Sequence, residues 1–248
     1  MYPIICKIGP LTVYSYGLML VLSFSIATLL IIHQAKKHGL NQDLIFNLAF
    51  IILISGIIGA RILYVIMNLK YYLSNPIEII MLTRGGLAWF GGLILGSLSC
   101  IVYLRRRGLD TYKIFDLIIP YVALAQGIGR IGCFLNGCCF GKESLRFGVY
   151  YPVHDTVLIP TQAYSSLALL GIYIILRIRQ GQEHPPGEIL YLYFLLYSLW
   201  RFFIEFFRGD SKIFILGLTV FQFFSIALFI LSVVMLIRIK KYKTIPKI

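Results

Sequence analysis

The sequence predicts an all-α, polytopic membrane protein with seven transmembrane helices. Three observations support this fold class: the apolar composition, the spacing of long apolar runs and the uneven distribution of basic residues. Hydrophobic residues make up 59% of the 248 residues, charged residues only 13%, and the mean hydropathy is +0.85. An ordinary soluble domain is about 45–50% apolar and about 25% charged. A soluble globule of this length could not bury so much apolar surface, so a membrane protein is expected.

Seven apolar segments are long enough to cross a bilayer, whose hydrocarbon core needs roughly 20 apolar residues in a helix. No segment has the composition of a soluble domain or a linker, so we expect a single integral membrane domain over residues 1–248. The longest connection, near 136–160, is rich in glycine and proline, which interrupt helices. The expected spans are 14–33, 44–67, 86–104, 114–135, 161–177, 188–207 and 217–238.

Basic residues, which produce the net charge of +13, are distributed unevenly between alternate connections. Thirteen lysines and arginines lie in one set of connections and at the C-terminus, whereas seven lie in the opposite set. The positive-inside rule therefore predicts a cytoplasmic C-terminus and an external N-terminus. The connections at 69–84, 136–160 and 208–216 are then expected to face outward. We do not expect a nucleic-acid partner, because basic loops in so hydrophobic a protein usually face anionic lipid.

Four ionisable residues lie within the expected spans: Arg61, Arg130, Arg201 and Glu205. Each costs roughly 2.5–3.5 kcal/mol on insertion scales, and such residues usually face a cavity or a partner. Arg201 and Glu205 are spaced i, i+4 and can pair along one helix face. Arg61 and Arg130 then have no obvious protein anion, and a lipid phosphate is the nearest alternative. Arginine suits phosphate because its planar guanidinium donates two hydrogen bonds at once.

Arg201 also belongs to a polar stripe with Tyr197, Glu205 and Arg208, in a span otherwise filled with apolar side chains. The spacings of four, four and three residues place these side chains on one helix face. Two interpretations remain open. The stripe either joins two helices through polar contacts, or it lines a polar cavity that opens toward the outer leaflet.

Glycines crowd the segments 85–96 and 127–141. Six glycines between 127 and 148 predict a non-helical stretch after about residue 132, in which Asn136 and backbone amides are available for hydrogen bonding. Cys133, Cys138 and Cys139 fall in this stretch. A structural metal site needs about four ligands, so we do not expect a metal here and interpret the cysteines as packing residues. A reactive thiol beside Arg130 remains an alternative.

Short motifs follow one another along nearly the whole chain. They are Gly9-Pro10, Tyr16-Gly17-Leu18, Gly59-Ala60-Arg61 with Tyr64, the double-glycine segment 85–93, Gly129-Arg130-Ile131-Gly132 with Phe134, Asn136, Gly137 and Gly141, Pro160-Thr161-Gln162-Ala163-Tyr164, and Tyr197, Arg201 and Glu205-Phe206-Phe207-Arg208. In these residues and in this order the chain resembles the phosphatidylglycerol–prolipoprotein diacylglyceryl transferase family, multi-pass enzymes of the bacterial inner membrane.

The resemblance implies a reaction and two substrates. The diacylglyceryl group of phosphatidylglycerol is transferred to the lipobox cysteine thiol in the signal peptide of a preprolipoprotein. A thioether forms and glycerol phosphate leaves, which is the first step of lipoprotein maturation. The resemblance also implies seven spans, an external N-terminus, and no metal or diffusible cofactor.

The resemblance further implies roles for individual residues. Arg130 would hold the phosphate and Asn136 would support the lipid headgroup. Arg201 and Glu205 would be catalytic, by stabilising the leaving phosphate and helping to deprotonate the thiol. The further residues expected to contact substrate are Tyr16, Arg61, Tyr197 and Arg208.

The chain departs from the family pattern at three positions. Phe90 stands where the family has a histidine, Cys133 where it has an asparagine and Cys138 where it has a glutamate. Phenylalanine cannot act as a base, so Glu205 or water would take the thiol proton, and losing a positioned base typically slows a reaction by about 10²–10⁴.

Two alternatives to the family reaction follow. The first keeps the fold but transfers a different lipid group, with Cys133 or Cys138 taking part. The second is a transporter or lipid-binding membrane protein without covalent chemistry. Transporters often contain internal repeats, and the two halves of this chain show no convincing repeat.

Overall fold

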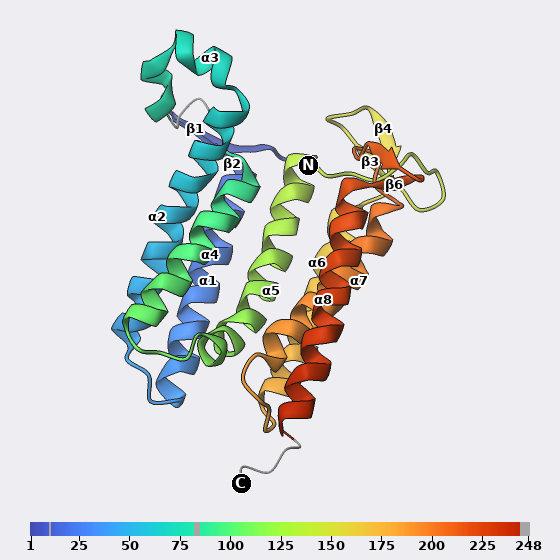
Figure 1. Ribbon diagram of the computed structural model, residues 1–248. Helices are drawn as coiled ribbons and strands as arrows, with labels where there is room; N and C mark the ends of the chain where they lie inside the picture. Colours follow the sequence, from blue (N-terminus) through green and yellow to red (C-terminus); the bar gives the residue numbers. More distant parts are fainter. Residues whose placement is uncertain (10, 82–84, 244–248) are drawn as a thin grey trace. The chain divides into compact units, whose positions relative to one another are not determined.

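The computed structural model describes residues 1–9, 11–81 and 85–243, and within them the protein is mostly helical (Figure 1). Each of the seven expected spans corresponds to one helix of at least 18 residues. Pro10, Arg84 and Lys247, which entered the motif series or the charge count, lie outside the described residues. The elements are β1 (Ile4–Ile8), β2 (Leu11–Tyr14), α1 (Ser15–Lys37), α2 (Gln42–Met67), α3 (Leu69–Ser74), η1 (Pro76–Ile80), α4 (Trp89–Arg106), α5 (Thr111–Asn136), β3 (Val149–Tyr151), β4 (Thr156–Leu158), α6 (Thr161–Gln180), α7 (Glu188–Glu205), β5 (Ile213–Ile215), β6 (Leu218–Thr219) and α8 (Val220–Lys243).

Five of these helices, α1, α2, α5, α6 and α8, are long and apolar enough to cross a membrane. The other two long helices, α4 and α7, have 18 residues each. Helix α4 ends on Arg105 and Arg106, and α7 contains Glu188, Arg201 and Glu205. The fold class is therefore that of a mostly helical, polytopic membrane protein.

The outer surfaces of the helices carry large apolar side chains. Leu29 in α1, Phe46 in α2 and Ile230 in α8 are each more than half exposed. In water, apolar patches of this kind mark interaction surfaces. On helices of membrane-spanning length they form the surface that lipid acyl chains cover.

Three short antiparallel hairpins accompany the long helices. Hairpin β1–β2 precedes α1, β3–β4 lies between α5 and α6, and β5–β6 lies between α7 and α8. In Figure 1, β3, β4 and β6 lie at the same end of α6, α7 and α8. An isolated antiparallel bridge also joins Gly141 to Arg208. Two connections that are far apart in the sequence therefore meet at this end.

Helix α5 ends within one residue of the expected span 114–135, and the predicted non-helical stretch begins later than expected. It continues to Asn136, whereas the glycines predicted a loss of helical structure after about residue 132. These glycines serve close packing instead. A Cβ atom on Gly132 would lie 2.8 Å from Cβ and 3.4 Å from Cγ of Met19 in α1, too close for a side chain. Small residues allow helices to approach this closely, and no break in the backbone is needed.

The chain forms two compact units, each described by itself. Unit 1 contains Met1–Ile31 and Phe115–Ile248, and unit 2 contains Ile32–Ile114. The core of unit 1 is built by α5, α6 and α7. Its fully enclosed cluster consists of Ala123, Ile172, Leu176, Ile189 and Tyr193.

A buried carboxylate fastens α7 to α5 within unit 1. Asp116 of α5 accepts hydrogen bonds from the backbone N–H groups of Gly187 at 2.6 Å and Leu190 at 2.9 Å. These are donors at the start of α7 that have no partner within their own helix. The carboxylate also lies at the positive end of the α7 dipole. This contact therefore sets where α7 begins relative to α5.

Unit 2 depends on the close packing of α2 against α4. A Cβ atom on Gly91 would overlap the carbonyl oxygen of Gly59 and would lie 2.6 Å from Cβ of Leu63. The backbone N–H of Ala88 donates to the carbonyl of Ala60 at 2.9 Å, just before α4 begins. The glycines of the 85–96 segment thus bring two helix backbones into contact.

Replacing Gly91 by alanine tests this packing. Gly91→Ala is expected to lower the free energy of unfolding by about 1–3 kcal/mol, because the added methyl group overlaps a backbone carbonyl. The matched control is Gly171→Ala in α6, where a Cβ atom would meet nothing within 4 Å. That variant should be neutral or stabilised by up to about 1 kcal/mol. Equal melting temperatures for the two variants in detergent would contradict the contact between α2 and α4.

Candidate functional site

Seven of the eight residues expected to contact or act on substrate belong to unit 1. Electrostatic interactions connect Arg130 with Tyr16, Arg201 and Cys139. They also connect Arg201 with Tyr197 and Arg208. The seven residues are Tyr16, Arg130, Asn136, Tyr197, Arg201, Glu205 and Arg208, and the eighth, Arg61, belongs to unit 2.

The C-terminal end of α5 is closed by a Schellman motif centred on Gly137. Its φ of 75° is in the left-handed region that glycine adopts without strain. The backbone N–H of Gly137 donates to the carbonyl of Phe134 at 3.2 Å, and that of Cys138 donates to the carbonyl of Cys133 at 3.1 Å. This pair of bonds defines the motif. The turn places Cys138 directly against Cys133, although five positions separate them in the sequence.

The backbone of residues 137–139 is held by side chains from the following connection and from α6. The ring Nε2 of His154 donates to the carbonyl of Gly137 at 2.8 Å, since a carbonyl can only accept. Gln162 donates to the carbonyl of Cys138 at 2.6 Å, and Thr161 donates to that of Cys139 at 2.8 Å. Three consecutive carbonyls are thus fixed, and so are the two cysteine residues that carry two of them.

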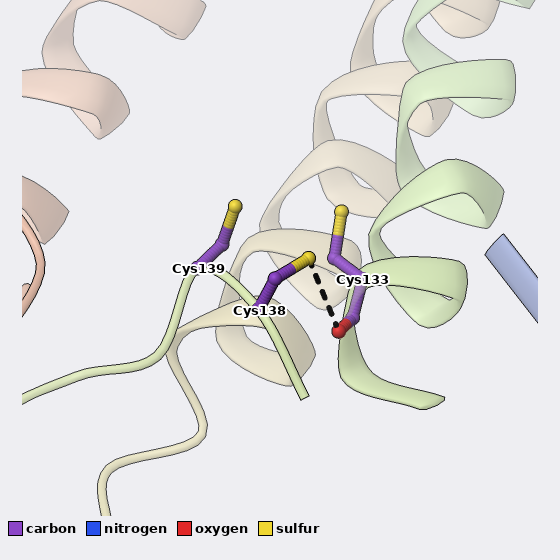
Figure 2. A group of neighbouring side chains, drawn as sticks. All are labelled: Cys133, Cys138 and Cys139. Carbon is purple, nitrogen blue, oxygen red and sulfur yellow. Dashed lines mark hydrogen bonds between the residues drawn. The ribbon is translucent and has the colours of Figure 1, made fainter. Parts of the chain in front are cut away.

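The thiols of Cys133, Cys138 and Cys139 lie together, with all sulfur atoms within 4.8 Å of one another. Figure 2 shows Cys133 at the end of α5 and the other two side chains on the loop that follows. The thiol of Cys138 also contacts the carbonyl of Cys133 at 3.7 Å. Cys139 has a φ of 63°, a strained conformation for a residue with a side chain, and such strain gathers at functional sites. All three are free thiols.

The backbone after Cys139 pairs with two segments, one just before α6 and one that follows α7. The backbone N–H of Gly141 donates to the carbonyl of Ile159 at 2.9 Å, and that of Lys142 donates to the carbonyl of Phe207 at 2.8 Å. A Cβ atom on Gly141 would lie 2.7 Å from the first carbonyl oxygen and 2.8 Å from the second. Glycine is therefore required for the two segments to pass, and their pairing brings Arg208 beside Cys139.

Arg208 and the thiols form one charged neighbourhood. Arg208 donates two parallel hydrogen bonds to Asp210, at 2.8 and 2.6 Å. Hydrogen bonds from the thiols of Cys133 and Cys138, followed by the positive charges of Arg208 and Arg130, lower the pKa of the Cys139 thiol against the effect of burial. A thiol in such surroundings has thiolate character, the form that reacts with electrophiles and binds metals.

Glu205 at the end of α7 is fully buried and only partly satisfied. Nη2 of Arg201 lies 2.9 Å from its Oε2, an i, i+4 ion pair that the sequence predicted. Thr219 donates to Oε1 at 3.0 Å. The ion-pair contact lacks hydrogen-bond geometry, so Oε2 accepts no hydrogen bond from any described residue. The guanidinium of Arg201 also lies over the ring of Phe221, 4.7 Å from its centroid.

Arg130 is half-buried in α5 and has no hydrogen bond or ion pair among the described residues. Two residues further along α5, Gly132 allows α1 to come close. A Cβ atom there would lie 2.8 Å from Cβ of Met19 and 3.5 Å from Cα of Tyr16. Tyr16 and Arg130 therefore line the same region, and the guanidinium of Arg130 has all its donors available for a bound anion.

Tyr197 and Asn136 complete the predicted set in unit 1. The ring of Tyr197 stacks on that of Tyr193, with centroids 5.7 Å apart, and Tyr193 donates to Oε1 of Gln126 at 2.8 Å. Asn136 is the last residue of α5 and is half-buried. Its side chain forms a hydrogen bond with the Cys138 thiol.

Arg61 differs from the sequence-based expectation, which gave it no protein partner. Its guanidinium donates to backbone carbonyls of Ile79, Gly85, Gly86 and Met81 at 2.8, 2.6, 2.9 and 3.2 Å, and to that of Glu78. The side chain is buried and also contacts the ring of Tyr72. Arg61 therefore organises the chain between α2 and α4, and its contact with substrate stays a prediction.

No sequence pattern predicted the residues that hold the site in place. His154, Gln162 and Thr161 fix the cysteine loop, and Thr219 contacts Glu205. Their partners are backbone carbonyls or a distant carboxylate, which no local pattern reveals. The Thr161-Gln162 pair was part of the motif series, and its two adjacent polar residues at a helix start were the available signal.

Comparison with known proteins shows the family of this chain. A family model for prolipoprotein diacylglyceryl transferase matches residues 3–238. The chain belongs to the prolipoprotein diacylglyceryl transferase family. Similar curated proteins include the phosphatidylglycerol–prolipoprotein diacylglyceryl transferase of Clostridium tetani (strain Massachusetts / E88), 36% identical over 241 residues, which covers 94% of this chain and 96% of that protein.

Further relatives carry the same description. The phosphatidylglycerol–prolipoprotein diacylglyceryl transferase 2 of Clostridium perfringens (strain 13 / Type A) is 34% identical over 243 residues, covering 96% of this chain and 94% of that protein. The enzyme of Streptococcus pyogenes serotype M5 (strain Manfredo) is 35% identical over 253 residues, with 98% and 97% covered. Membership in the diacylglyceryl transferase family makes the chain a transferase and argues against a transporter or a lipid-binding protein without covalent chemistry.

The different surroundings of the two arginines predict opposite effects on stability. Arg61→Ala leaves buried carbonyls without donors, each costing about 1–3 kcal/mol, so it should lower the melting temperature in detergent strongly. Arg130→Ala removes no protein hydrogen bond and should melt within about 2 °C of the unchanged protein, as expected for a change near zero free energy. A comparable loss of stability in both variants would show that Arg130 has a structural role.

Proposed function

We propose that this protein transfers the diacylglyceryl group of phosphatidylglycerol to the lipobox cysteine thiol of a preprolipoprotein. The observation that carries the proposal is the surroundings of Arg130. Among the described residues, Arg201 and Arg208 each have a carboxylate partner, whereas Arg130 has none. A charged group at membrane depth needs a partner of opposite sign. The phosphodiester of an anionic lipid supplies one.

The bonds of this reaction assign tasks to the polar residues. A C–S bond forms between the thiol sulfur and the terminal glyceryl carbon of the lipid, while the C–O bond from that carbon to phosphate breaks. Glycerol phosphate leaves with the electron pair. Arg130 holds the phosphate through two parallel hydrogen bonds, and Asn136 and Tyr16 position the headgroup. Donors aimed at the leaving group lower the barrier most, because its charge grows during the reaction.

Arg201 acts on the leaving phosphate, and Glu205 acts on the attacking thiol. Arg201 stabilises the leaving phosphate together with Arg208, and Glu205 accepts the thiol proton on its carboxylate, whose Oε2 is paired with Arg201. Thr219 and Arg201 hold the carboxylate in place for this transfer. Tyr197 lines the same helix face one turn before Arg201. The proton ends on the departing phosphate, so acid and base are balanced over the reaction.

The proposal includes a location and a topology. The protein is a multi-pass protein of the bacterial inner membrane with seven spans, an external N-terminus and a cytoplasmic C-terminus. Supporting this, thirteen basic residues follow one set of connections and seven the other. The site residues at the ends of α5 and α7 then face the outer leaflet, where secreted preproteins emerge.

Substituting Arg130 tests the phosphate contact directly. In a transfer assay with phosphatidylglycerol and a lipobox peptide, Arg130→Lys should lose about 10²–10³ in rate, because lysine keeps the charge but lacks the planar pair of donors. Arg130→Ala should show no detectable transfer. The matched control is Arg146→Ala, since Arg146 is exposed in the outer connection and lies over the ring of Phe147. Full activity in a folded Arg130→Ala protein would overturn the proposal.

The topology is tested independently of activity. A reporter fused after Ile248 should be cytoplasmic, whereas one inserted at Asp155, in the turn of hairpin β3–β4, should be external. The charge asymmetry requires opposite sides for the two reporters. Reporters on the same side would contradict the seven-span arrangement.

A further inference from the structure

The cluster of Cys133, Cys138 and Cys139 has the geometry of a partly assembled metal site. In a tetrahedral zinc site the Zn–S bonds of about 2.3 Å put neighbouring sulfur atoms about 3.8 Å apart. The three sulfur atoms here already lie within 4.8 Å of one another. Small rotations of the side chains, of about 1 Å at the sulfur atoms, complete the set. Cysteine thiolates are soft ligands that select ions such as Zn²⁺.

The cluster is also rigid before any ion binds. The turn at Gly137 sets Cys138 against Cys133, and the carbonyls of Cys138 and Cys139 are held by Gln162 and Thr161. Groups that fix the orientation of metal ligands raise metal affinity. Packing alone does not require three consecutive carbonyls to be fixed by three side chains. The arrangement holds the backbone of Cys138 and Cys139 in place, so that small side-chain rotations are enough to bring the sulfur atoms together.

The local charge matches a thiolate site. Three thiolates and one Zn²⁺ leave a net charge of −1, which needs a cation nearby when the site is half-buried. Arg208 and Arg130 are the cations whose charges act on the sulfur of Cys139. In addition, no histidine, aspartate or glutamate within the described residues joins the three cysteines as a fourth ligand. Three protein ligands with one open position are typical of catalytic rather than structural zinc sites.

We propose that Cys133, Cys138 and Cys139 bind Zn²⁺ through their sulfur atoms, and that the open fourth position takes the thiol of the protein substrate. Zinc binding is inferred from the geometry of the cluster. Coordination of the substrate thiol rests on the proposed function, because only that function brings a substrate thiol to this site. The sequence predicted no metal, because three ligands are fewer than the four that a closed structural site uses.

Coordination of the substrate thiol by zinc would activate it for the transfer. A thiol bound to zinc is deprotonated outright, so its proton leaves to Glu205 and later reaches the departing phosphate. The zinc-bound sulfur then donates its electron pair to the glyceryl carbon as the C–O bond to phosphate breaks. The thioether formed is neutral and a weak ligand, so it leaves the metal. Zinc keeps its oxidation state throughout.

Metal binding is tested first, without any activity measurement. The full chain is purified in detergent under reducing conditions and given Zn²⁺ alone, and we expect about one Zn²⁺ per chain. Cys138→Ser and Cys139→Ser should lose at least about nine-tenths of this metal, since each removes one of three ligands. The matched controls are Cys6→Ser and Cys100→Ser, which change an exposed and a buried cysteine outside the cluster. Absence of zinc from the unchanged protein, or equal loss in the controls, would overturn the proposal.

A second measurement uses only the unchanged protein, in case a variant fails to fold. Iodoacetamide should modify Cys138 and Cys139, the half-exposed members of the cluster, in chelator-treated protein and should spare them once Zn²⁺ is added. Exposed Cys6 serves as the internal control, because it should react equally in both samples. Equal modification with and without Zn²⁺ would contradict a metal site.

The catalytic half is tested by chelation and metal return. Transfer should fall at least about 100-fold when zinc is removed, because the thiol loses its activating partner, and should return with Zn²⁺. Unchanged transfer after complete removal of zinc would overturn this role while leaving the proposed function intact. Stoichiometric zinc binding by a protein that never transfers the lipid group would instead sink the proposed function and confirm the metal site alone.

Discussion

The left-handed turn at Gly137 is the constraint on which the candidate site depends. Helix α5 must satisfy its last carbonyls where it ends, and the Schellman motif does so by folding the chain back over the final turn. A residue with a Cβ atom would be strained at a φ of 75°. Because the chain reverses here, Cys138 contacts Cys133 and the next residues run toward the segment after α7.

Gly141 imposes a second constraint on the same stretch of backbone. Gly141 passes between two backbones at a distance that excludes any side chain, and its bridge to Arg208 joins the end of α5 to the end of α7. Three side chains fasten the carbonyls between the two glycines. A short backbone segment thereby positions thiols, an arginine and the neighbouring helix ends together. The rigidity comes from hydrogen bonds that satisfy backbone groups, so it adds no unpaired polar atoms.

The two arginines at membrane depth show two solutions to the same electrostatic problem. Arg61 is surrounded by carbonyl dipoles, which satisfy its donors without any anion. Arg130 has no such shell, and Glu205 keeps one buried oxygen without a hydrogen bond. The donors of Arg130 are therefore available to an anionic ligand, whereas those of Arg61 are occupied by the protein backbone.

The sequence alone determined the helical membrane fold, the family and one ion pair of the candidate site. Apolar composition and span length predicted one long helix at each expected position, because the thickness of a bilayer leaves few other solutions. The i, i+4 spacing predicted the pair of Arg201 with Glu205, since both lie on one helix. The motif series indicated the transferase family, which the matches to known proteins confirmed.

Only the tertiary structure decided what each polar group contacts. It gave Arg61 backbone carbonyls as partners, extended α5 to Asn136 and brought the sulfur atoms of Cys133, Cys138 and Cys139 within 4.8 Å of one another. Periodicity describes one element at a time, and these outcomes depend on backbone carbonyls and on contacts between segments distant in the chain. Glycine is the reason that the sequence is ambiguous here. It permits close helix packing at Gly132, a left-handed turn at Gly137 and a tight backbone crossing at Gly141, and only the neighbours of each glycine determine which of these occurs.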